Sequence, residues 1–175
     1  MSDRAESEVY EQQAERVRVC LKLINNLKFR RMEMIYTKLT KIAMKLCFEK
    51  HKSQVDKCGL PYPFHPFHVA ESMVDEESTC VALLHDILED TDTTTDDLIS
   101  LGFTPAIIEA VCLMTHDDNM PYLEYVKQIK VNSIARAVKI SDLMHNSDLT
   151  RLDTISERDI QRVEKYKKAL DILLN

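Results

Sequence analysis

The fold is decided by residues 78–90, which run Ser-Thr-Cys-Val-Ala-Leu-Leu-His-Asp-Ile-Leu-Glu-Asp. This is the most apolar stretch of the chain, and it contains His85 and Asp86 before the two acids Glu89 and Asp90. A continuous apolar run predicts an element that is buried on all sides. We therefore place residues 78–88 at the centre of the fold, with the His-Asp pair buried inside it.

The composition favours helices. A chain of 175 residues has room for one domain of ordinary size, and 45% of its residues are hydrophobic. It contains only two glycines, where average usage would supply about a dozen. So few glycines argue against a P-loop, a Rossmann site or a many-turned β sandwich. We expect one all-α domain, a single helical bundle over residues 31–175, with residues 1–30 as a helical N-terminal extension.

Apolar residues at helical spacing and capping residues predict the individual helices. One helix is expected over residues 9–27, and a second has an apolar stripe from Ile35 to Leu46 and ends at His51. Residues 53–64 form a loop, after which Pro66 is the expected first residue of the next helix. Further helices are predicted from capping boxes at Thr94/Asp97 and Ser156/Asp159, from Thr104-Pro105, and over residues 122–130 and 133–146.

The charge balance excludes some classes of binding partner. With 23 basic and 29 acidic residues the net charge is −6, so no global basic field exists to hold nucleic acid or an anionic membrane. The N-terminus is charged, and no apolar run approaches the roughly 18 residues of a membrane span. The five cysteines never occur in a Cys-x-x-Cys spacing, which favours reduced thiols. We expect a cytoplasmic protein, and the sequence leaves a homo-oligomer open.

His85 and Asp86 are costly residues in such an apolar context. A buried aspartate needs an ionic partner or a metal, although a His-Asp pair by itself is more often structural. Glu89 follows His85 by four residues and Asp90 follows Asp86 by four, so each pair shares a helical face if the helix continues that far. A divalent cation offsets the repulsion of clustered carboxylates. We interpret the crowding as part of a metal site.

Two further residues are candidate ligands. His51 ends a predicted helix, and Asp142 lies in the apolar segment 137–144. Taken alone, His51 would be a surface histidine and Asp142 a buried aspartate bound to a hydroxyl or a lysine. With His85 and Asp86 they offer two imidazoles and two carboxylates from three helices. Mixed nitrogen and oxygen ligands suit Mn, Fe or Zn better than a thiolate site would.

The order of the motifs resembles a known family. Residues 36–152 are similar to the HD-domain metal-dependent phosphohydrolases, above all to the hydrolase domain of the RelA/SpoT family and to the small alarmone hydrolases. The resemblance rests on residues 50–54, 57–62, 65–70, 82–91 and 138–146. It implies an HD-domain bundle that hydrolyses a phosphate or pyrophosphate ester on a nucleotide, most simply the 3′-pyrophosphate of guanosine 3′,5′-bis(diphosphate), (p)ppGpp.

The resemblance also implies roles for individual residues. The ligands of one divalent transition metal, usually Mn²⁺ with Fe, Zn, Co and Ni as alternatives, would be His51, His85, Asp86 and Asp142. Glu89 and Asp90 would orient or deprotonate the attacking water, and Asn146 would contact the substrate. Lys52, Lys57 and Lys139 could balance charge on the phosphoryl group, although Lys139 could simply pair with Asp142. His65 matches the histidine of the family's His-Pro motif. The sequence is equally compatible with a role of His65 beside the metal and with a packing role.

Some positions depart from the family pattern. Val55 and Asp56 stand before Lys57 where the family commonly has a basic pair, and Leu143 and Ser147-Asp148 stand where it tends to have arginines. These departures keep two alternatives open. One is an HD phosphohydrolase acting on another nucleotide, such as a nucleoside monophosphate phosphatase, and the other is a non-catalytic nucleotide-binding regulatory module.

Overall fold

The computed structural model describes residues 34–117 and 119–175, and these belong to one compact unit, Glu33–Asn175. The predicted helix over residues 9–27 and the extension over 1–30 lie outside the described residues. Within them the secondary structure is helical apart from one isolated antiparallel bridge between Val55 and Pro61, so the all-α prediction is confirmed. The helices are α2 (Lys38–His51), α3 (Phe64–Glu71), α4 (Glu76–Leu84), α5 (Ile87–Asp90), α6 (Thr95–Ser100), α7 (Pro105–Met114), α8 (Tyr122–Lys130), α9 (Ser133–Ser147), the 3₁₀ turn η1 (Leu149–Arg151) and α10 (Glu157–Leu174).

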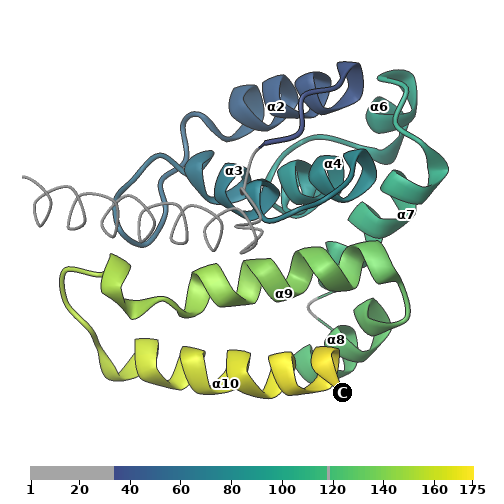
Figure 1. Ribbon diagram of the computed structural model, residues 1–175. Helices are drawn as coiled ribbons and strands as arrows, with labels where there is room; N and C mark the ends of the chain where they lie inside the picture. The colour runs from purple at the N-terminus through teal and green to yellow at the C-terminus, as the bar shows by residue number, and fades with distance from the viewer. Residues whose placement is uncertain (1–33, 118) are drawn as a thin grey trace, which may run out of the picture. The chain divides into compact units, whose positions relative to one another are not determined.

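The apolar helix α4 lies at the centre of this unit, as its sequence predicts. It packs against α2, α3, α7 and α9 (Figure 1). Every residue from Ser78 to Leu84 is buried, and only the first two residues of α4, Glu76 and Glu77, are partly exposed. A short helix that is buried on all sides is stable only when other helices enclose it. Its C-terminal end, at His85, therefore lies in the interior of the protein.

The helix does not continue through the His-Asp pair. α4 ends at Leu84, and Asp86, with φ −105° and ψ 2°, opens the separate one-turn helix α5. His85 and Glu89 therefore do not share one face of a continuous helix, and that expectation is corrected. No glycine or proline marks this break, so a pattern based on breakers cannot detect it.

The helix caps predicted from short sequence motifs are present in the structure. Thr94 with Asp97 and Ser156 with Asp159 each form a complete capping box, and Thr104 caps a helix whose first residue is Pro105. Two helix starts differ by a few residues. α2 begins at Lys38, after the cap Thr37, and α3 begins at Phe64 rather than at Pro66. Pro66 is tolerated there because N–H groups in the first turn of a helix need no partner within it.

The helix α9 connects the centre to the C-terminal part of the chain. It packs against α3, α4 and α7 on one side and against α8 and α10 on the other (Figure 1). Its residues Ala135, Val138, Asp142 and Leu143 are buried, so a carboxylate on its inner face lies among apolar side chains. Among the described residues, no helix is long and apolar enough to cross a membrane.

Removal of the N-cap of the central helix α4 tests this architecture. The Asp75 carboxylate accepts hydrogen bonds from the Ser78 backbone N–H at 2.7 Å and from the Ser78 hydroxyl at 2.8 Å. Replacing Asp75 by alanine should lower the free energy of unfolding by about 0.5–2 kcal/mol, measured by urea denaturation, because the first N–H groups of α4 lose their acceptor. Asp75→Asn keeps an acceptor and should cost clearly less. Equal losses for the two variants would contradict the capping role.

Candidate metal centre

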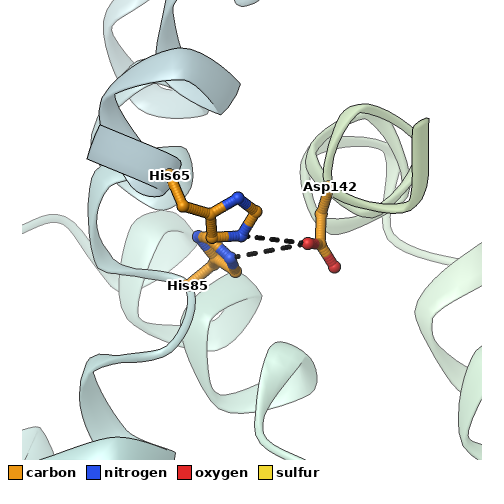
Figure 2. A group of neighbouring side chains, drawn as sticks. All are labelled: His65, His85 and Asp142. Carbon is orange, nitrogen blue, oxygen red and sulfur yellow. Dashed lines mark ion pairs between the residues drawn. The ribbon is translucent and has the colours of Figure 1, made fainter. Parts of the chain in front are cut away.

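Three buried side chains from three helical segments converge on one point (Figure 2). His65 comes from α3, His85 follows the last residue of α4, and Asp142 comes from α9. One ligand atom from each lies within 4.8 Å of the others. The Asp142 Oδ1 atom lies 3.2 Å from His65 Nε2 and 3.9 Å from His85 Nε2. This spacing brings together atoms that can ligate a single cation.

Asp86 adds a second carboxylate to this group. Its Oδ2 atom lies 2.8 Å from His85 Nε2 and 4.0 Å from His65 Nε2. The Tyr62 hydroxyl donates a hydrogen bond to the same oxygen and so fixes the orientation of the carboxylate. We call His65, His85, Asp86 and Asp142 the metal-site cluster. It presents two imidazole nitrogens and two carboxylates at the end of the buried helix α4.

The tautomer of His85 shows that the cluster fits a cation. Its Nδ1 atom lies 2.7 Å from the Ala82 carbonyl oxygen, which can only accept, so Nδ1 carries the proton in the neutral ring. The lone pair is then on Nε2, which is buried and has no hydrogen-bond partner although it faces Asp86 and Asp142. A lone pair facing carboxylate oxygens is repelled unless a positive charge lies between them. A divalent metal meets that requirement, and a carbonyl at Nδ1 is the usual outer partner of a ligating histidine.

The charges around His85 also favour a cation at this site. Burial lowers the pKa of His85, but the carboxylates of Asp86 and Asp142 outweigh burial and raise the pKa to about 9. The field that attracts a proton to this ring also attracts a metal ion, because both carry positive charge.

Asp142 is held by two further contacts. Its Oδ2 atom lies 2.9 Å from Lys139 Nζ, and Asn146 Nδ2 donates to Oδ1 at 2.5 Å. Burial would raise the pKa of Asp142, but Lys139, followed by His65 and His85, holds it well below its usual value. Lys139 and Asn146, which we expect to contact substrate, therefore orient a carboxylate of the cluster in this structure.

His51 is fully buried at the end of α2, and its Nε2 atom, like that of His85, has no hydrogen-bond partner among the described residues. Its Nδ1 atom lies 2.6 Å from Gln54 Oε1, and its ring centroid lies 5.2 Å from that of Tyr62. The group of mutually close ligand atoms in the described part of the chain is His65, His85 and Asp142, and it contains neither His51 nor Asp86. The His-Pro motif singled out His65, but a helix that begins at Pro66 would exclude this residue; α3 begins at Phe64 and contains it.

The two acids after the His-Asp pair lie on α5, and both residues are exposed. The Glu89 Oε2 atom accepts a hydrogen bond from the His116 backbone N–H at 2.9 Å. Burial, followed by the negative charges of Asp86 and Glu89, raises the pKa of Asp90. A carboxyl with a raised pKa releases and takes up a proton closer to neutral pH, which suits acid–base chemistry.

The two surface lysines of the prediction differ in their surroundings. Lys52 is exposed and pairs with Glu49 at 2.6 Å, an arrangement typical of a solvated helix surface. Lys57 is also exposed, and burial followed by the positive charge of Arg162 lowers its pKa, with Lys165 adding to the effect. Lys57 therefore feels the charges of α10, which include Asp159 as well as Arg162 and Lys165.

Comparisons with known proteins agree with this geometry, although no family model matches the chain. The guanosine-3′,5′-bis(diphosphate) 3′-pyrophosphohydrolase MESH1 of Danio rerio is 36% identical over 132 residues, which cover 67% of this chain and 72% of the relative. The Homo sapiens MESH1 protein has the same identity and coverage. A guanosine-3′,5′-bis(diphosphate) 3′-pyrophosphohydrolase of Aquifex aeolicus is 47% identical over 132 residues, covering 69% of this chain and 18% of the relative.

A solved structure shares the fold. It is described as a metazoan ortholog of SpoT that hydrolyzes ppGpp, and it matches with a TM-score of 0.66 at 26% sequence identity. The match covers 81% of this chain and 88% of that chain.

An all-α bundle with buried histidines and aspartates at the end of its central helix defines an HD-domain hydrolase, as the sequence predicts. The chain belongs to the MESH1/SpoT-type family of HD-domain pyrophosphohydrolases, because a relative at 36% identity is covered over 72% of its length.

The ion pair of Lys139 and Asp142 should be strongly stabilising in the protein without metal. The Lys139 side chain is only 12% exposed, so Lys139→Met would leave a buried carboxylate without its ammonium partner. We expect a loss of about 3 kcal/mol in the free energy of unfolding in the presence of EDTA.

A surface pair supplies the control for this prediction. Lys127 pairs with Glu124 at 2.7 Å and is 56% exposed, so Lys127→Met should change stability by much less. Addition of Mn²⁺ should recover part of the loss in Lys139→Met, because a cation again compensates Asp142. A Lys139→Met protein as stable as the Lys127→Met control would contradict the argument.

Proposed function

We propose that this chain is a metal-dependent hydrolase that removes the 3′-pyrophosphate from guanosine 3′,5′-bis(diphosphate). The observation that carries the proposal is the buried, unpartnered Nε2 atom of His85, 2.8 Å from Asp86 Oδ2 and 3.9 Å from Asp142 Oδ1. The substrate is taken from the relatives, several of which are named for hydrolysis of this nucleotide.

We assign the metal to His51, His85, Asp86 and Asp142, the set expected from the sequence. His51 and His85 each have a buried Nε2 atom without a hydrogen-bond partner, whereas His65 Nδ1 lies 2.7 Å from His145 Nδ1 and His65 Nε2 lies 3.2 Å from Asp142 Oδ1. Two nitrogens and two carboxylates suit one divalent transition metal, and Mn²⁺ is the first candidate ahead of Fe, Zn, Co and Ni. Such a metal lowers the pKa of a water ligand and polarises a phosphoryl oxygen.

Glu89 and Asp90 are the candidates for handling the proton of the attacking water. Asp90 is the first candidate for the general base, because its pKa is raised and its carboxyl feels the charge of Asp86. Glu89 holds the backbone N–H of His116 through Oε2 and so ties α5 to the segment that follows α7. We propose that Glu89 orients the water while Asp90 accepts its proton.

The phosphate groups that the metal does not hold need other cations. Arg151 and Arg162 are already paired, with Asp56 and with Asp159, each at 2.6 Å. Lys57 is exposed, and Lys165 Nζ of α10 lies 4.5 Å from the centroid of the Tyr122 ring. We propose that Lys57 and Lys165 bind the remaining phosphates of the nucleotide. The cytoplasmic location and the roles of Lys52, Lys139 and Asn146 toward substrate stay predictions.

The metal assignment can be tested by comparing two buried histidines. His51→Gln should lose stoichiometric metal, measured by elemental analysis of protein purified without chelator, because it removes a ligand nitrogen. His65→Gln should keep the metal. Circular dichroism and melting temperatures show whether each variant is folded. Loss of metal in His65→Gln but not in His51→Gln would replace His51 by His65 and overturn the assignment.

The substrate assignment can be tested with the manganese-loaded protein and ³¹P NMR. Incubation with ppGpp should give GDP and pyrophosphate, because water attacks the 3′-pyrophosphate and the 3′-hydroxyl leaves. Asp86→Asn, which removes an anionic ligand, should give no product. Release of two orthophosphates from ppGpp would contradict the removal of an intact pyrophosphate. Dephosphorylation of nucleoside monophosphates while ppGpp survives would show that the chain acts on another nucleotide.

A further inference from the structure

Two acids at positions that depart from the family pattern take part in contacts within the protein. Asp56 belongs to the loop between α2 and α3, residues 52–63, and Asp148 precedes the turn η1, which follows α9 and ends at Arg151. The Oδ2 atom of Asp56 lies 2.6 Å from Nη2 of Arg151, which is 95 positions further along the chain. This ion pair joins the loop to the end of α9.

Asp56 also determines the shape of the loop. Its Oδ1 atom accepts hydrogen bonds from the backbone N–H groups of Cys58 at 2.8 Å and of Leu60 at 2.9 Å. Backbone hydrogen bonds of Asp56 with Leu60 and Gly59 close the same turn, in which Gly59 has a positive φ of 76°. Lys57 lies inside this turn, so the position of its backbone follows that of Asp56.

Arg151 is held in place from the other side. Asp148 caps η1, because its Oδ1 atom accepts from the Thr150 backbone N–H at 2.9 Å and from the Thr150 hydroxyl at 2.6 Å. Nη1 of Arg151 donates to the carbonyl oxygen of His145, in the last turn of α9, at 3.3 Å. The guanidinium therefore contacts the helix with one nitrogen and the loop with the other.

The ion pair is better shielded from water than a surface pair. The side chains of Asp56 and Arg151 are 12% and 23% exposed, whereas those of Glu49 and Lys52 are 61% and 56% exposed. Burial raises the pKa of Asp56, but its two backbone N–H partners, followed by the charge of Arg151, lower the pKa below its usual value. The carboxylate thus stays ionised, and solvent screens the pair less than it screens an exposed one.

We propose that Asp56 and Arg151 form a clamp that positions Lys57 for the phosphate groups of the nucleotide, with Asp148 holding Arg151 in place. This inference rests on the proposed function, in which Lys57 binds phosphate, but its structural part can be measured without substrate. Among the described residues, the hydrogen bonds and ion pairs of Asp56 and Arg151 involve none of the four proposed metal ligands.

The structural part is tested with Arg151→Met, which removes the guanidinium, and with Asp56→Asn, whose amide oxygen can still accept from the loop N–H groups. The matched control is Arg136→Met at an exposed position of α9. In the full chain loaded with diamagnetic Zn²⁺, amide hydrogen exchange at Gly59 and Leu60 should be about 10-fold faster in Arg151→Met and unchanged in the control. The double variant of Arg151→Met and Asp56→Asn should show no more than the larger single effect, because both substitutions break the same pair.

Kinetics with ppGpp and the manganese-loaded protein test whether the clamp acts through Lys57. Arg151→Met should raise KM by about 10-fold, with kcat and metal content unchanged, because the apparent affinity falls with the fraction of the protein in the binding-competent arrangement. In a Lys57→Met background, Arg151→Met should raise KM no further, since the cation that the clamp positions is absent. Arg151→Lys keeps a charge for Asp56 and should recover part of the KM.

Three results would overturn the inference. Unchanged amide exchange in Arg151→Met would show that the pair does not hold the loop, and effects of Arg151→Met and Lys57→Met on KM that simply multiply would show that the clamp does not act through Lys57. Loss of metal or of kcat with KM unchanged would place the pair in the support of the metal centre instead. If the wild type hydrolyses no nucleotide, the proposed function fails together with the role of Lys57, whereas amide exchange still decides whether the ion pair holds the loop.

Discussion

The structure depends on the negative charge that is gathered around the Nε2 atom of His85. Asp86 and Asp142 approach this nitrogen while the other ring nitrogen is bound to the Ala82 carbonyl, and the two carboxylates raise the pKa of the ring to about 9. Such an arrangement is costly in an apolar interior. It is tolerated because α4 is enclosed by four helices whose packing supplies the compensating free energy, and because a cation converts repulsion into coordination.

Neighbouring side chains reduce the cost of burying the two carboxylates. Lys139 occupies one oxygen of Asp142, Asn146 binds the other, and Tyr62 binds Asp86. Each contact orients a carboxylate before any ligand arrives. Orientation by such outer partners raises metal affinity, since less side-chain freedom is lost on binding.

The features that sequence reasoning found are the local ones. Capping boxes such as Thr94 with Asp97 involve residues three apart, and the apolar run of α4 reports its own burial, so both were predictable. The break after Leu84 was not predictable, because no glycine or proline lies there and the backbone of Asp86 leaves the helical conformation without a local signal. The ion pair of Asp56 with Arg151 was missed because the two residues lie 95 positions apart, and nothing in the spacing of a loop aspartate signals that bond.

The pairing of Lys139 with Asp142 has a consequence for the order of events at the site. With the His85 ring protonated, one ammonium and one imidazolium against two carboxylates leave no net charge. A divalent ion that displaces this proton would leave a single positive charge, so the centre would attract anions even though the whole chain carries −6. An anionic ligand should therefore bind more tightly after the ion than before it.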